Sequence, residues 1–121
     1  MASPRSLVRL RGLVEAPPDR VAPLIIDAPV DPLVRTVERD HAAGLLTLQG
    51  GWWYRGETRI APHEAGTLVS HEIFDLTGNP RWLMWPVTHK PLRNAPAEFA
   101  TRLAEIGARL GCRAHPLDGT A

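Results

Sequence analysis

The strongest constraint in this sequence is an alternating pattern that runs from 52 to 76 and is interrupted once by a turn. In 52–61 (WWYRGETRIA), alternate residues fall into two chemically different sets. One set is apolar or small: Trp52, Tyr54, Gly56, Thr58 and Ile60. The other is charged apart from one tryptophan: Trp53, Arg55, Glu57 and Arg59. A turn at 62–66 and a second alternating segment at 67–76 complete a β-hairpin. An antiparallel sheet with one apolar face is therefore predicted.

The length of the turn decides whether His71 or Glu72 faces the interior, because adjacent residues of a strand point to opposite faces. A four-residue turn, 63–66, places His71 inside, near Thr58. A five-residue turn places Glu72 inside instead, because a slip of one residue exchanges the two faces of the whole strand. The residues of the hairpin are compatible with both registers.

Three strands and a short helix are predicted before the hairpin. The strands are expected at 6–16, 34–39 and 45–49, and the helix at 18–26. The segment 27–33 holds two prolines and two aspartates and is typical of a loop. Gly50 and Gly51 indicate a break in the chain just before the hairpin.

The clearest helix is predicted at 96–110 (PAEFATRLAEIGARL). Its apolar stripe has helical spacing and consists of Phe99, Leu103, Ile106 and Leu110. Gly111 suits the position that follows the end of a helix. The breakers in 77–95 predict an irregular segment, with one helical turn at 82–85 at the mouth of any cavity. The tail, 112–121, is expected to fray.

Together these elements predict an α+β fold in which an antiparallel sheet curls around a long C-terminal helix. The chain has 121 residues, which is the size of one domain. We expect a single domain over 1–121, with its core at about 6–111.

Composition and charge exclude several classes of function. The net charge is +1, which gives no electrostatic reason to expect nucleic acid or an anionic membrane as a partner. There is no run of 18 apolar residues, and the first residues have no apolar segment typical of a signal peptide, so a cytoplasmic protein is expected. Cys112 is the only cysteine, which excludes an internal disulfide. No phosphate-binding glycine motif and no metal-ligand spacing is present, so neither a cofactor nor a metal is expected.

The hairpin WWYRGETRIAPHEAGTLVSHEIFDL resembles the closing hairpin of the START-like superfamily, also called SRPBCC or Bet v 1-like, which includes polyketide cyclases. The resemblance rests on the aromatic strand that ends near Pro62, the Gly66-Thr67 turn and the alternating strand that follows. The strand and short helix at the start of the chain, and the long last helix, fit as well. The resemblance implies a helix-grip fold that binds an apolar small molecule between sheet and helix, and it favours His71 on the inside.

The chain departs from the START-like pattern by lacking one hairpin and a second helix between the first two strands. A shortened sheet leaves either an open groove or a groove that a second subunit closes, as in a homodimer.

We expect the ligand to be an apolar or aromatic small molecule. The candidate lining residues are Tyr54, Thr58, His71, Ile73, Trp82, Trp85, Phe99 and Leu103. His71 and Tyr54 are the candidate polar anchors and the candidate catalytic residues. One alternative function is a polyketide cyclase or aromatase that uses His71 as acid and base. Another is an oligomeric interaction module that uses an exposed surface at Trp82 and Trp85.

Overall fold

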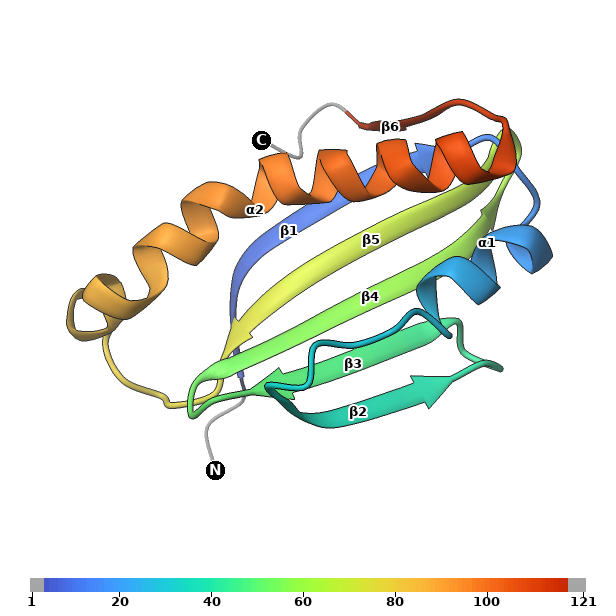
Figure 1. Cartoon of the computed structure of the whole chain (residues 1–121). Coiled ribbons are helices and arrows are strands. Elements are labelled where there is room, and N and C mark those ends of the chain that lie inside the picture. The colour runs from blue at the N-terminus through green and yellow to red at the C-terminus, as the bar shows by residue number, and fades with distance from the viewer. Residues whose placement is uncertain (1–3, 118–121) are drawn as a thin grey trace.

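The computed structural model describes residues 4–117, which form one antiparallel sheet and two helices (Figure 1). The elements in chain order are β1 (Arg5–Val14), α1 (Pro18–Ile25), β2 (Val34–Asp40), β3 (Leu45–Gly50), β4 (Tyr54–His63), β5 (Gly66–Asp75), α2 (Arg81–Leu110) and β6 (Ala114–Pro116). The strands lie in the order β2-β3-β4-β5-β1-β6. The predicted α+β class, an antiparallel sheet with a long C-terminal helix, is confirmed.

The β4–β5 hairpin has the register of the four-residue turn, because His63 pairs directly with Gly66. Thr58 consequently lies opposite His71 on the face that carries the apolar core. The five-residue alternative, with Glu72 inside, is wrong. A slip to that register would expose the fully buried Val69 and place a carboxylate in the core, which is energetically costly.

The predicted strand at 52–61 begins two residues late, at Tyr54. Residues 51–53 form a turn in which Gly51 has a positive φ of 63°, so strand alternation does not apply there. Trp53, expected on the solvated face, is buried and its carbonyl accepts a hydrogen bond from Leu76 N at 2.9 Å. Trp52, expected on the apolar face, is exposed. Both tryptophan expectations are therefore wrong.

Helix α2 is twice as long as predicted and includes 81–95, which we expected to be irregular. Pro86, Pro91 and Pro96 lie inside it, and each lacks the N–H that would bond to the residue four positions earlier. Figure 1 shows the helix bending away from the sheet in its first half. Burial maintains the helix, because Met84 and Thr88 continue the buried stripe of the second half back toward its start.

The chain after α2 does not fray at once, contrary to our expectation for 112–121. Gly111 ends the helix in the left-handed conformation, with a φ of 66°, as predicted. The three residues of β6 then pair with β1. The amide of Glu15 also donates to the carbonyl of Arg113 at 2.8 Å. The remainder of the predicted tail, 118–121, lies outside the described residues.

The core lies between α2, α1 and one face of the sheet (Figure 1). Leu103 of α2 is fully buried against β1, where a Cβ atom at Gly12 would overlap its side chain. The second half of α2 therefore packs closely on β1 and β6, at one side of the sheet. The inner side chains of β3, β4 and β5 are left with space between them and the helix.

The tight connection between β4 and β5 gives a prediction for stability. Gly66 has a φ of 142°, and a Cβ atom there would overlap the Val14 carbonyl oxygen and lie 2.8 Å from the Ala16 nitrogen. Gly78 also has a positive φ, of 73°, but no atom lies within 4 Å of its would-be Cβ. Gly78→Ala should cost about 1–2 kcal/mol of backbone strain alone. We expect Gly66→Ala to cost at least about 1 kcal/mol more, because the end of β1 must also move.

The measurement is urea unfolding of both variants and of the unsubstituted chain. Equal losses of unfolding free energy in the two variants would contradict the close packing of the β5 start against β1.

Candidate ligand-binding cavity

A cavity of about 570 Å³ lies between α2 and the inner face of β3, β4 and β5. Its floor comes from side chains of the sheet: Leu46, Leu48, Tyr54, Thr58, Val69, His71 and Ile73. Its opposite wall comes from α2, with Ile25 of α1 at one side. Most of these side chains are apolar, and the polar groups of the sheet are concentrated in three residues, Tyr54, Thr58 and His71.

The structure brings six of the eight predicted lining residues to this cavity. They are Tyr54, Thr58, His71, Ile73, Phe99 and Leu103. Trp82 and Trp85 are not among its walls, and they are 76% and 62% exposed. The reason is the length of α2, because its first turns run beyond the sheet instead of folding over the mouth of the cavity (Figure 1).

His71 is held in a defined position at the floor of the cavity. Its Nδ1 atom lies 2.9 Å from the Thr58 hydroxyl oxygen, across the β4–β5 pair. Its ring stacks on Phe99 of α2, with ring centroids 6.2 Å apart and planes inclined by 18°. Thr58 can donate to Nδ1 or accept from it, so Nε2 is free to act as a donor or as an acceptor. Among the described residues, no hydrogen bond to Nε2 is formed.

The pKa of His71 is lowered from 6.5 to about 4, mainly by burial and to a lesser extent by the nearby positive charge of Arg102. Removing the ring from water disfavours its charged form. The imidazole is therefore neutral at neutral pH, and it presents a hydrogen-bonding group without a charge to the cavity.

Tyr54 contributes a second uncharged polar group. Its pKa is raised by burial, and to a lesser extent by the carboxylate of Glu98, so the phenol stays protonated. Its hydroxyl lies over Gly56, where a Cβ atom would come within 2.6 Å of the oxygen. Glycine at this position thus gives the tyrosine side chain room along the floor. The Tyr54 ring also meets the buried Trp53 edge to face, at 5.5 Å between centroids.

The charged residues that line the cavity are all exposed residues of α2 at its mouth, namely Glu98, Arg102 and Glu105. The Arg102 Nη2 atom donates to the carbonyl of Leu24 at 3.1 Å, which ties α2 to the end of α1. The sequence analysis did not identify Glu98 and Arg102 as residues at the mouth of a cavity. It also missed Leu46 and Leu48, although the alternation in 45–49 indicates that one face of that strand is apolar.

Asp75, at the end of β5, stabilises the turn that follows this strand. Its carboxylate is buried, and one oxygen accepts hydrogen bonds from the amide and the hydroxyl of Thr77 at 2.8 and 2.7 Å. These bonds hold the turn that leads into α2. Within residues 4–117, no three His, Cys, Asp or Glu side chains gather closely enough to hold a metal ion.

Comparison with known proteins finds no matching family model, no matching curated protein and no matching solved structure. No helix among the described residues is long and apolar enough to cross a membrane. The function must therefore be argued from the cavity itself.

The buried His71 gives a prediction for stability against pH. The unfolded chain binds a proton at His71 near pH 6.5 and the folded chain only near pH 4, so lowering the pH between these values destabilises the fold. From pH 7 to pH 5 we expect His71 alone to cost about 2 kcal/mol of unfolding free energy. The His71→Gln variant should lose that part of the pH dependence.

Urea unfolding at the two pH values checks this, with His115→Gln as the control because His115 is exposed at the sheet edge. A titration of the His71 ring by NMR with a midpoint near pH 6.5 would contradict the burial argument.

Proposed function

We propose that this protein binds a neutral, largely apolar or aromatic small molecule in the cavity between the sheet and α2, as a reduced helix-grip domain of the START-like type. The observation that carries the proposal is a cavity of about 570 Å³ with apolar walls and uncharged polar groups at its floor. Ligand sites of small molecules have volumes of roughly 300–1,000 Å³ and few, well-placed polar groups. The resemblance of the hairpin to the START-like superfamily supports the same function.

The polar groups indicate what the ligand carries. His71 offers Nε2 in a neutral ring, and Tyr54 offers a protonated hydroxyl. Both suit a phenol, carbonyl or amide on an otherwise apolar ligand. A carboxylate is disfavoured because the floor holds no cation and two carboxylates, Glu98 and Glu105, stand at the mouth. The one guanidinium at the mouth, Arg102, already donates to the Leu24 carbonyl.

A polyketide cyclase or aromatase that uses His71 as acid and base is the enzymatic alternative. General base catalysis works best when the pKa of the base lies near the working pH. The pKa of His71, about 4, lies well below neutrality, so its ring is a weak base and is never a proton donor in its charged form at neutral pH. Binding is therefore favoured over proton transfer as the role of this residue.

The binding function can be tested by filling the cavity with a larger side chain. Ala95 of α2 is buried and lines the cavity, whereas Ala104 of the same helix is exposed and lies outside it. The neutral dye N-phenyl-1-naphthylamine should bind with one dye per chain, seen as enhanced fluorescence. Ala95→Phe should weaken this binding at least about tenfold, since the added ring occupies ligand volume. Ala104→Phe should leave it unchanged.

Displacement of the dye tests the charge of the ligand. The neutral competitor 1-naphthol should displace it at a concentration at least about tenfold lower than the anion 1-naphthoate. If Ala95→Phe and Ala104→Phe are both folded by circular dichroism and bind the dye equally well, the proposed cavity function is overturned.

Assembly is a second candidate function, and it is favoured by the exposed apolar side chains on the first half of α2. Trp82, Leu83, Trp85 and Val87 are all exposed there. Trp85 is held in place by stacking on His89, with 4.2 Å between ring centroids. Rigid, exposed tryptophans on the surface of a small domain are typical of an interface, and a second copy of the chain is the proposed partner.

If this surface forms a dimer, the double variant Trp82→Ser, Trp85→Ser should be a monomer by sedimentation at a concentration where the unsubstituted chain is a dimer. The matched variant Leu33→Ser removes an exposed apolar side chain far from α2 in sequence and should keep the dimer. An unchanged assembly state in the double variant would rule out this surface as the interface.

A further inference from the structure

The outer face of the sheet, opposite the cavity, has a shallow hollow of about 260 Å³. Its walls are Arg9 and Arg11 of β1, Glu57 and Arg59 of β4, and Ser70 and Glu72 of β5. Arg11 and Arg59 flank Ser70 directly in the register of the three strands, so all three side chains point to the same face. Ser70 is the smallest of the set, and it forms the floor between the longer side chains.

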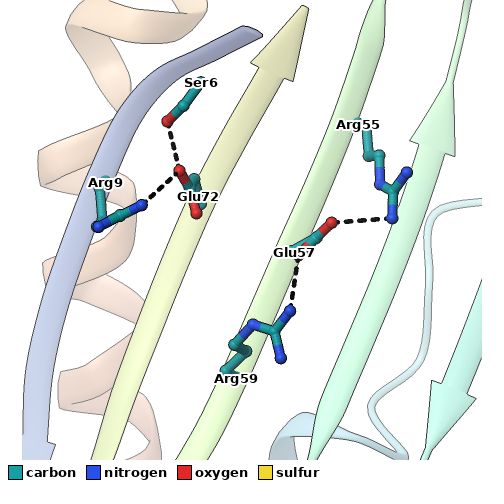
Figure 2. A network of polar contacts seen from close by, with 6 residues as sticks. All are labelled: Ser6, Arg9, Arg55, Glu57, Arg59 and Glu72. Atoms are coloured by element: carbon teal, nitrogen blue, oxygen red, sulfur yellow. Dashed lines mark hydrogen bonds and ion pairs between the residues drawn. The ribbon is translucent and has the colours of Figure 1, made fainter. Parts of the chain in front are cut away.

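Both carboxylates that line the hollow already have cationic or hydroxyl partners, as Figure 2 shows. On the β1 side, Glu72 accepts from the Ser6 hydroxyl and from Arg9, the latter at 3.2 Å. Glu72 does not pair with Arg11, the other arginine of β1 on this face.

On the β4 side, the two oxygens of Glu57 are divided between two arginines (Figure 2). Arg55 pairs with one oxygen at 2.9 Å, and Arg59 reaches the other at 3.4 Å. The shorter contact belongs to Arg55, so Arg59 is the weaker partner of this carboxylate. Among the described residues, three arginines and two glutamates line the hollow, and Arg11 makes no ion pair with either carboxylate, whereas Arg59 makes only the longer contact to Glu57.

The carboxylates also lie deeper than the guanidinium groups. The side chains of Glu57 and Glu72 are 12% and 18% exposed, whereas those of Arg59 and Arg9 are 58% and 69% exposed. A molecule that approaches from solvent therefore meets guanidinium groups first.

We propose that this hollow binds a phosphate group of a small molecule, with Arg11 and Arg59 as bidentate donors and the Ser70 hydroxyl as a third donor. Two guanidinium groups and a hydroxyl match the several acceptor oxygens and the double charge of a phosphate monoester. A nucleic acid is disfavoured, because the chain has a net charge of only +1. This site lies on the face of the sheet opposite the ligand cavity, so it does not depend on the proposed function.

The experiment titrates the full chain with inorganic phosphate, and separately with glycerol 3-phosphate, at constant ionic strength. The arginine Nε–H signals and the Ser70 amide are followed by NMR. We expect saturable shifts of Arg11, Arg59 and Ser70 with both probes. Arg11→Gln and Arg59→Gln should each weaken binding at least about tenfold, because each removes one charge-assisted pair of hydrogen bonds. Arg20→Gln removes the same charge from an exposed position of α1 and should leave the affinity unchanged.

Tighter binding of glycerol 3-phosphate than of inorganic phosphate would assign the site to phosphate monoesters, and equal binding would assign it to the phosphate group itself. Either result supports the site. Shifts that do not saturate, or an equal loss of affinity in Arg20→Gln, would overturn it. If a short single-stranded oligonucleotide binds more tightly than phosphate and displaces it, the hollow is part of a polyanion-binding surface and the proposed phosphate site is overturned.

Discussion

The close approach of Leu103 to Gly12 determines how α2 sits on the sheet. Because residue 12 has no side chain, the fully buried leucine packs directly on the backbone of β1. A larger residue at 12 would require the Leu103 side chain to move, and its Cβ atom would also lie 3.2 Å from the His115 carbonyl oxygen. The contact is reinforced where β6 pairs with β1 beside the end of α2. The helix is thus anchored along one side of the sheet, and a cavity is left between it and the inner side chains of β3, β4 and β5. The cavity is a consequence of this one-sided anchoring.

The chemistry of the cavity follows from its burial. His71 and Tyr54 are polar groups whose charged forms are disfavoured away from water, so both are neutral. Thr58 and Phe99 orient the His71 ring from two different elements, which leaves one nitrogen for a ligand. Charges are confined to the mouth, where solvent screens them. A site with neutral hydrogen-bonding groups discriminates between ligands by shape and by hydrogen bonding, in contrast to the arginine-rich outer face.

The register of the β4–β5 hairpin sets both faces at once. In β5, His71 faces the cavity, while its neighbours Ser70 and Glu72 face the outer surface. A slip of one residue would place Glu72 in the apolar cavity and remove Ser70 from between Arg11 and Arg59. The neutral interior and the charged exterior are therefore two results of the same pairing of strands.

The sequence by itself determined β1 to β5, the short helix and the second half of α2, because their periodic patterns depend on near neighbours in the chain. It also identified six of the residues that meet at the cavity, although their role as ligand contacts stays a prediction. Only the tertiary structure decided the register of the hairpin, since both turn lengths suited the residues. Likewise, 81–95 is helical despite its prolines because Met84 and Thr88 find burial. Strand β6 exists because β1 offers it an unpaired edge, and no local pattern in three residues can indicate a partner about 100 positions away.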